Sequence, residues 1–217
     1  MDSEAAQRHL HVQFGCGPNS APNGWINFDA SPTLRLQRIP IIGSIITARR
    51  PRFAPGVRYG DIVAGLPLPD GSCAAIYSSH VIEHLPYEDA LKGFAESYRL
   101  LEDGGRFRVV VPDLAALTRA YLKRHETADP EAASAFMQAS YLGVRERHGR
   151  LADMLVRSFG NSAHLWMWDL PSLTEAAVKA GFSSVRPAVF NDSCDPSFEG
   201  VESPERFIDA VAIEAQK

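Results

Sequence analysis

Short apolar segments separated by turn residues recur through the first half of the chain. Five of them predict β-strands, because they are too short for helices and apolar at most positions, as in strands buried on both faces of a sheet. The five predicted strands cover residues 10–14, 25–29, 57–59, 74–78 and 106–111.

Apolar residues return at helical spacing between the last two of these strands, over residues 87–101. The resulting stripe consists of Ala90, Leu91, Phe94, Tyr98 and Leu101. It predicts an amphipathic helix, and we expect Asp103-Gly104-Gly105 to end this helix with a left-handed turn. A strand, a helix and a further strand in this order predict an α/β fold with a parallel sheet and right-handed crossovers.

The pattern changes after Pro112-Asp113, where helical stretches replace strands. Residues 114–124, 130–146 and 149–159 have helical patterns with turn or capping residues between them. They predict a helical insertion, placed at 114–165, within a single domain that spans 1–217. We expect this insertion to form a lid at the end of the sheet where the strands finish.

The last part of the chain predicts a helix and two closing strands. The helix covers residues 172–180, because Ser172 and Glu175 have the spacing of a capping box and Gly181 follows as a C-terminal turn residue. Residues 184–190 and 210–214 are apolar enough to be strands, and we expect them to pair as an antiparallel hairpin with a long connection.

Composition narrows the class of protein without naming a function. Apolar residues make up 45% and charged residues 22% of the 217 residues, which excludes a disordered or fibrous chain. The net charge of −4 gives no indication of nucleic-acid binding. The cysteines at 16, 73 and 194 are too far apart for a zinc ribbon or a disulfide framework, and free thiols predict a cytoplasmic location.

One segment, residues 34–55, departs from the acidic character of the rest. It interleaves five isoleucines with five arginines. A crossover helix with its arginines in water explains this composition, since amphipathic helices of this kind are common. A lid, or a patch that makes weak contact with a membrane surface, is the alternative.

The first predicted strand leads into Gly15-Cys16-Gly17, and the second ends at Asp29. A glycine turn lets a ligand approach the backbone, and an acid at the end of the next strand can bind a ribose. A dinucleotide site requires a third glycine where this chain has Ser20, and an acid later than Asp29, which follows Gly17 by only twelve residues. A nucleoside cofactor without a pyrophosphate, such as S-adenosylmethionine, explains both departures. A glycine turn that merely connects two strands remains an alternative.

Six motifs in order then carry a resemblance to a known family. They read G-x-G, W-I-N-x-D, G-D-x-x-x-x-L-P-x-P-D-G-S, S-S-H-V-I-E-H-L, R-L-L-x-x-G-G-R-F and V-P-D. This series resembles the class I S-adenosylmethionine-dependent methyltransferases, and most closely the branch called methyltransferase type 11. The resemblance is dense over residues 10–113 and weak over 170–185. It implies a Rossmann-like, mostly parallel sheet with an antiparallel last strand.

The resemblance also implies roles for individual residues. The two glycines would admit the methionine tail, Asp29 would accept hydrogen bonds from the ribose, and Asp61 would face the adenine amino group with Ile62 on the ring. Ser79 and His80 would line the methyl-transfer cleft. The residues assigned in this way to the cofactor are Gln13, Gly15, Gly17, Asp29, Asp61, Ile62 and Ser79. Gln13 stands where the family often has an acid, so its contact with the ligand would lack that charge.

Histidines near the expected cleft favour O-methylation of a small-molecule, glycan-type or lipid-linked acceptor, because a hydroxyl must lose its proton to a base. Methylation of a nitrogen or carbon atom stays open. His80 and His164 are the candidate catalytic residues, and Asp113 is explained as a helix N-cap. Trp166 and Trp168 either line an acceptor pocket beside His164 or cap the hydrophobic core.

His80 to His84 also match H-x-x-E-H, a zinc peptidase pattern that needs both histidines on one helical face. Because the motif follows a strand and precedes Pro86, we expect no metal site. Two other functions stay open on the sequence alone. They are an NAD-dependent oxidoreductase and a binding module that holds S-adenosylmethionine without catalysis.

Overall fold

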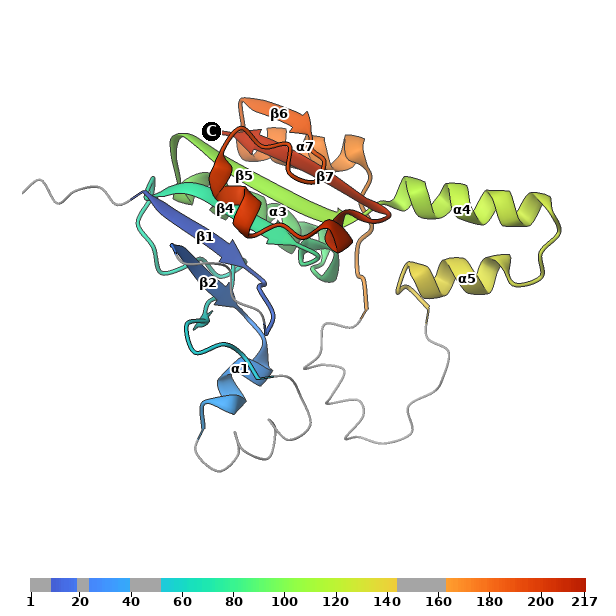
Figure 1. Ribbon diagram of the computed structural model, residues 1–217, viewed down its shortest axis with the longest axis horizontal. Helices are drawn as coiled ribbons and strands as arrows, with labels where there is room; N and C mark the ends of the chain where they lie inside the picture. The colour runs from blue at the N-terminus through green and yellow to red at the C-terminus, as the bar shows by residue number, and fades with distance from the viewer. Residues whose placement is uncertain (1–8, 19–23, 40–51, 144–162) are drawn as a thin grey trace, which may run out of the picture.

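The computed structural model describes residues 9–18, 24–39, 52–143 and 163–217. Within these residues, seven strands form one sheet in the order β3-β2-β1-β4-β5-β7-β6 (Figure 1). The strands are β1 (Leu10–Phe14), β2 (Trp25–Asp29), β3 (Arg58–Tyr59), β4 (Cys73–Ser79), β5 (Leu101–Pro112), β6 (Ser184–Pro187) and β7 (Ala210–Gln216). The first five are parallel, and β7 runs antiparallel to both of its neighbours. The predicted Rossmann-like sheet with an antiparallel last strand is therefore confirmed.

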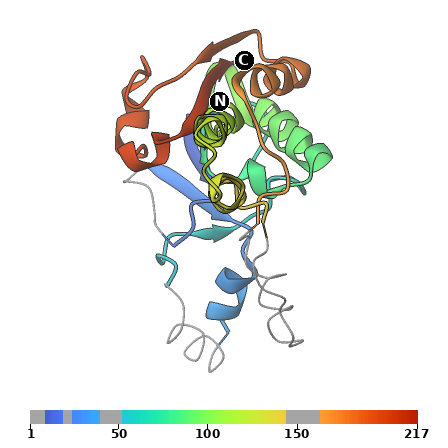
Figure 2. The same ribbon diagram turned by 90° about the vertical axis from the view of Figure 1, so that its right-hand side faces the viewer.

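The two faces of the sheet are covered differently. The helices α3 (Tyr87–Leu100) and α7 (Leu170–Ala180) cover one face, where they enclose the largest apolar cluster, which includes Phe94, Phe107 and Leu173. The short 3₁₀ helices η2 (Pro196–Gly200) and η3 (Pro204–Phe207) lie on the other face, where Phe198 packs on Tyr77. Figure 2 shows the sheet between these two covers.

The end of α3 differs from the expectation. The helix ends at Leu100, before the glycines, and Leu101 is already extended with φ −69° and ψ 140°. Leu101 pairs with Cys73 of β4, so the sheet takes the residue that helical spacing assigned to the helix. The glycines lie inside β5, at a shift of register where Arg106 becomes the partner of Ala75 and Gly104 adopts φ +82°. They form a bulge, as glycine in a strand often does.

The start of α7 also differs from the expectation. Asp169 is the N-cap, and its side chain accepts a hydrogen bond from the Ser172 amide at 3.0 Å while the Ser172 hydroxyl accepts one from the Asp169 amide at 3.1 Å. The capping box therefore lies one turn earlier than the predicted Ser172 and Glu175. Gly181 ends the helix at φ +110°, as expected.

Beyond β5, α4 (Leu114–Glu126) and α5 (Ala132–Ala139) lie side by side and project away from the sheet (Figure 1). Asp113 caps α4, as predicted, by accepting a hydrogen bond from the Ala115 amide at 2.9 Å. The predicted helix over 130–146 is shorter in the structure, and the one over 149–159 lies outside the described residues.

The basic segment 34–55 is described only at its two ends. Helix α1 (Pro32–Gln37) overlaps its first residues. Residues 40–51 fall outside the described part of the chain, so the expected crossover helix, and the alternative of a lid or a surface patch, lie outside the described residues as well. Among the helices that the structure describes, none is both long and apolar enough to cross a membrane.

Candidate active site

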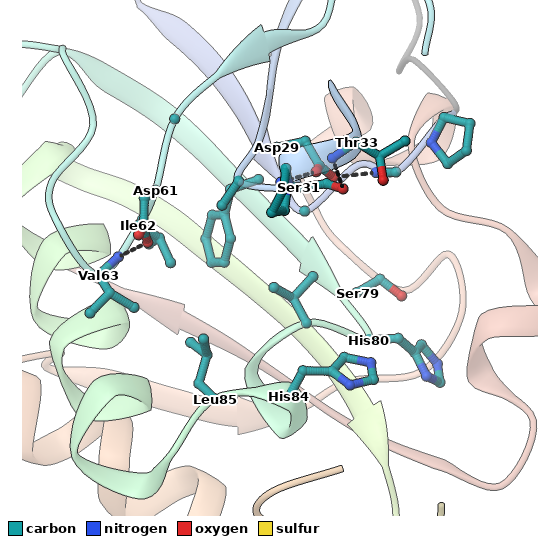
Figure 3. A pocket seen from close by; sticks show the side chains of 18 of the residues that line it. Asp29, Ser31, Thr33, Asp61, Ile62, Val63, Ser79, His80, His84 and Leu85 are labelled. Atoms are coloured by element: carbon teal, nitrogen blue, oxygen red, sulfur yellow. Dashed lines mark hydrogen bonds between the residues drawn. The ribbon is translucent and has the colours of Figure 1, made fainter. Parts of the chain in front are cut away.

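A cavity of about 620 Å³ opens at the carboxyl ends of β1 to β4 (Figure 3). Its lining includes Gly15, Gly17, Asp29, Asp61, Ile62, Ser79 and His80. These residues come from four separate segments that sequence reasoning placed at a cofactor. The volume suits a small molecule, and the position is where open α/β sheets bind their ligands.

The two glycines after β1 differ in the space around them. Both have left-handed backbones, with φ +67° at Gly15 and +63° at Gly17. A Cβ added to Gly15 would lie 2.2 Å from the Cγ2 atom of Val81, so this glycine lets β1 approach the turn after β4. A Cβ on Gly17 would meet nothing within 4 Å, so the backbone there is open toward the cavity.

Asp29 holds the glycine turn from the end of β2. It is 7% exposed, and its Oδ2 atom accepts a hydrogen bond from the Gly17 amide at 2.9 Å. Its Oδ1 atom accepts one from the amide of Ser31, the N-cap of α1, at 2.7 Å. Because each carboxylate oxygen has two acceptor positions, Asp29 can still accept hydrogen bonds from the hydroxyls of a ribose in the cavity.

Asp61 and Ile62 form the opposite wall from His80 (Figure 3). The Oδ1 atom of Asp61 accepts a hydrogen bond from the Val63 amide at 2.9 Å, which fixes the side chain in the turn after β3. Ile62 is 5% exposed and offers an apolar surface to a ring. An acid and an apolar side chain at this wall suit an adenine, whose amino group donates hydrogen bonds.

Gln13 is the predicted cofactor residue that the structure does not bring to the cavity lining. It lies within β1, in register with Asn27 of β2 and Tyr77 of β4. Side chains alternate along a strand, so Gln13 is on the opposite face from Phe14, which lines the cavity. Its contact with a cofactor stays a prediction.

His80 lines the cavity at the end of β4 with a strained backbone, since its φ is +56°. Its Nε2 atom lies 2.9 Å from the Arg206 carbonyl oxygen, and a ring nitrogen that faces a carbonyl must carry the proton. The Nδ1 atom therefore has the lone pair, and it lies 3.6 Å from Oε1 of Glu83. Burial lowers the pKa of His80, which favours the neutral ring.

His164 lies behind the cavity and does not line it. It is 8% exposed, and its ring centre is 4.9 Å from that of His84. Burial, and then the charge of His84, lower the pKa of His164 to about 4, so it is neutral at physiological pH. The two candidate catalytic histidines thus belong to one cluster, but only His80 contacts the cavity.

Glu83 is the centre of that cluster, and sequence reasoning gave it no role. Its side chain is 1% exposed, and neither carboxylate oxygen has a hydrogen-bond partner in the part of the chain that the structure describes. Burial raises the pKa of Glu83 to about 8. The signal in the sequence was a charged residue among the apolar residues of a buried turn, the 3₁₀ helix η1 (Ile82–His84).

Trp168 takes the core position that was one of the two expectations, whereas Trp166 is exposed. Trp168 is fully buried and packs on Phe94 and Tyr87. Trp166 is 43% exposed and covers Tyr87 with ring centres 4.7 Å apart. Neither indole lines the cavity.

Comparisons with known proteins give one family match and several similar solved structures. Residues 43–109 match the family described as "Methyltransferase domain". A SAM-dependent methyltransferase from Thermotoga maritima is similar at 18% identity, with 96% of this chain and 82% of that chain covered and a TM-score of 0.48. Another, from Archaeoglobus fulgidus, is 16% identical, with 97% and 86% covered and a TM-score of 0.49. No curated protein sequence matches the chain.

The strand order agrees with the fold that the motifs implied. The order of β3, β2, β1, β4 and β5 is that of a doubly wound sheet, and the antiparallel β7 beside β5 completes the arrangement that the motifs implied. Residues 43–109 thus match the methyltransferase domain family, and the sheet has the Rossmann-like arrangement that the motifs implied.

Proposed function

We propose that the chain is an S-adenosylmethionine-dependent methyltransferase that binds this cofactor in the cavity between the glycine turn and Asp61, and methylates a hydroxyl of a small-molecule, glycan-type or lipid-linked acceptor. One observation carries the proposal: four segments that are distant in sequence bring the expected cofactor residues to a single cavity. An open backbone at Gly17 and a carboxylate at Asp29 suit the tail and the ribose.

The cavity has two ends with different chemistry. Asp61 and Ile62 lie at one end and suit the adenine, while Ser79 and His80 lie at the other (Figure 3). Arg206 also lines the cavity, and its carbonyl oxygen lies 2.9 Å from Nε2 of His80. A cofactor bound in this direction would direct its methyl group toward His80. The acceptor then enters beside His80 and Arg206.

In the reaction, the acceptor oxygen forms a bond to the methyl carbon while the bond from that carbon to sulfur breaks. S-adenosylhomocysteine leaves with the electron pair, and the hydroxyl proton must pass to a base. His80 lines the cavity and is the candidate proton acceptor, which supports O-methylation. For His80 to act directly, its ring must turn away from the Arg206 carbonyl, because the lone pair faces Glu83.

Isothermal titration with S-adenosylhomocysteine tests the cofactor site. We expect the wild-type protein to bind, and Asp61→Asn to bind at least tenfold more weakly, because the amide keeps the Val63 hydrogen bond but loses the charge that attracts the adenine amino group. Asp103→Asn, at an exposed position in the β5 bulge, is the matched control and should bind like the wild type. A folded protein without affinity for either S-adenosylmethionine or its product would contradict the site.

The acceptor class needs a separate measurement. We expect wild-type protein with labelled S-adenosylmethionine to transfer the methyl group to a hydroxyl compound in a panel of glycans, lipid-linked sugars and small alcohols. Label found only on amines or carbon acids would overturn O-methylation and leave the cofactor site intact.

We also propose a cytoplasmic location and weak contact of residues 34–55 with a membrane surface. Cys16, Cys73 and Cys194 are free thiols in the structure, which suits a reducing compartment.

In the basic segment 34–55, Arg35 lies on the ring of Tyr59 at 3.7 Å, so part of the basic charge of this segment is used within the protein. Co-sedimentation with anionic liposomes at low salt tests the contact, and protein that stays in the supernatant would remove it.

A further inference from the structure

Three imidazoles and a carboxylate converge beside the cavity, from β4, η1 and the segment before α7. Measured to Oε1 of Glu83, the distance is 3.6 Å from Nδ1 of His80, 3.8 Å from Nε2 of His84 and 4.0 Å from Nε2 of His164. Glu83 and His164 are buried, and His84 lines the cavity. This cluster is separate from the residues assigned to the cofactor.

The hydrogen bonds that His80 and His84 make on the side away from Glu83 decide whether the ring nitrogens facing Glu83 carry a proton or a lone pair. His84 has its Nδ1 atom 3.0 Å from the Ala163 carbonyl, and His80 has its Nε2 atom 2.9 Å from the Arg206 carbonyl. Both of these nitrogens must carry protons, so the opposite nitrogens direct lone pairs at the carboxyl group of Glu83. When Glu83 is ionised, its oxygens also offer only lone pairs, and the described residues place no other donor on them. Acceptor atoms collected in this way are arranged for a cation.

We propose that Glu83, His84 and His164 bind a divalent transition-metal ion of the zinc class. Their ligand atoms all lie within 4.8 Å of one another. Zinc binds imidazole nitrogen and carboxylate oxygen at about 2.0–2.2 Å, so ligand atoms around it stand about 3.3–3.5 Å apart. The two distances from Glu83, 3.8 and 4.0 Å, need to contract by only about half an ångström.

The surroundings resemble those of a metal-bound histidine. A ligating imidazole typically donates its other N–H to a backbone carbonyl, which is the bond that His84 makes to Ala163. The carbonyl of Glu83 accepts hydrogen bonds from the amides of Leu165 and Trp166, which brings His164 to the turn from eighty residues away. Three protein ligands leave a fourth position open, and it adjoins the cavity because His84 lines it.

The H-x-x-E-H motif did not predict this site, because a peptidase zinc site needs both histidines of the motif on one helix. Here the motif spans a strand end and the 3₁₀ turn η1, and the second imidazole ligand is His164 from another segment. His80, whose Nδ1 atom lies 3.6 Å from the same carboxylate, is outside the proposed set of ligands.

Metal content and a cobalt spectrum test the site without reference to catalysis. Tag-free wild-type protein, stripped with a chelator and titrated with Zn²⁺, should bind close to one ion per chain. With Co²⁺ it should show the visible absorption bands of a four-coordinate site. Glu83→Gln and His164→Asn should each weaken Zn²⁺ binding at least 100-fold and abolish the bands.

His125→Asn is the matched control, because His125 is exposed on α4 and stacks only on Tyr121, and it should bind like the wild type. Circular dichroism of each variant in chelator confirms that it is folded, and Glu83→Gln keeps the size of the buried side chain. Wild-type protein that binds no zinc and gives no cobalt bands would overturn the proposal, as would equal binding by Glu83→Gln. Binding of S-adenosylhomocysteine, measured in parallel, distinguishes this failure from a failure of the cofactor site.

Discussion

Gly15 and Gly17 differ in what a side chain would meet, and this gives a matched pair of substitutions. Gly17→Ala should cost about 1–2 kcal/mol of the free energy of unfolding, because alanine disfavours the left-handed backbone. Gly15→Ala should cost about 1–3 kcal/mol more, because its Cβ would overlap Val81. Urea unfolding of the two variants measures the difference.

Shortening Val81 isolates the steric part of this difference. The double variant Gly15→Ala, Val81→Ala should recover part of the loss that Gly15→Ala alone causes, relative to Val81→Ala. Equal stability of the two glycine variants would show that the contact with Val81 does not restrict position 15.

Glu96 predicts a dependence of stability on pH. Burial acts to raise its pKa, but hydrogen bonds from Arg99 and from the Leu66 amide, 2.8 Å away, outweigh it and hold the pKa below its usual value. A lowered pKa contributes stability above the usual value of about 4.3 and loses it as the pH falls through the folded-state pKa.

Glu96→Gln should therefore flatten the fall in the free energy of unfolding between about pH 5 and pH 3. At pH 7 we expect it to cost about 1–2 kcal/mol, from the weaker hydrogen bonds. Glu199→Gln, at an exposed position, should keep the wild-type profile. A Glu96→Gln profile parallel to the wild type would show that this carboxylate does not contribute to acid sensitivity.

At the level of elements, the two capping boxes considered for α7 predict different losses. Asp169→Ala should lower the free energy of unfolding by about 1 kcal/mol, because it removes the acceptor of the Ser172 amide. Glu175→Ala should cost less than about 0.5 kcal/mol, since Glu175 makes only an exposed ion pair with Lys179 at 2.8 Å. Thermal unfolding of both variants compares them, and a larger loss at Glu175 would contradict the cap seen in the structure.

The strands were predictable because their signal is local. Residues such as Val109 to Val111 are apolar in succession and fully buried in a central strand. The ends of helices and strands were less predictable, because two elements can compete for the same residue. Leu101 fits the apolar stripe of α3 but pairs with Cys73 of β4 instead. Asp169 is the N-cap of α7, so the helix begins before the predicted cap at Ser172. Such outcomes depend on neighbours that are distant in the sequence.

Part of the candidate site was likewise predictable from local sequence, and part was not. The residues assigned to the cofactor follow individual strands, so the sequence could place Asp29 and Asp61 at the edge where parallel strands end. The meeting of Glu83 with His164 could not be read from spacing, because the chain between them passes through α3, β5 and the helices α4 and α5. Gln13 is on the opposite face of β1 from Phe14 and does not line the cavity, so its contact with a cofactor stays a prediction.

At the scale of the whole molecule, Arg108 joins β5 to β7 and to the connection between β6 and β7. It is fully buried, donates to Glu202, to Glu214 at 3.1 Å and to Asp192 at 2.8 Å, and also reaches the Val189 carbonyl. Arg108→Met should lower the free energy of unfolding by about 3–5 kcal/mol, because it leaves buried carboxylates without this partner.

Arg106→Met is the control for Arg108→Met. Arg106 pairs with the same Glu214 at 3.3 Å but is 26% exposed, so its loss should cost about 1 kcal/mol or less. Chemical denaturation measures both variants. Similar losses would show that burial does not decide the contribution of these ion pairs.

Ligand-dependent melting tests the class of protein as a whole. S-adenosylhomocysteine should raise the melting temperature in proportion to the logarithm of its concentration, because it binds the folded state, while NAD should have no effect. A shift with NAD alone would support the dinucleotide enzyme that the glycine turn left open.

The place of β7 inside the sheet has a consequence for synthesis. Its partner β5 ends at Pro112, but β7 begins at Ala210, about 100 residues later. At a translation rate of about 5–20 residues per second, the growing chain carries an unpaired edge along Val109 to Val111 for roughly 5–20 s. An apolar open edge of this kind is a template for pairing with other chains. The nascent protein is therefore expected to be most prone to aggregation, and most in need of a chaperone, in the interval before its last strand emerges from the ribosome.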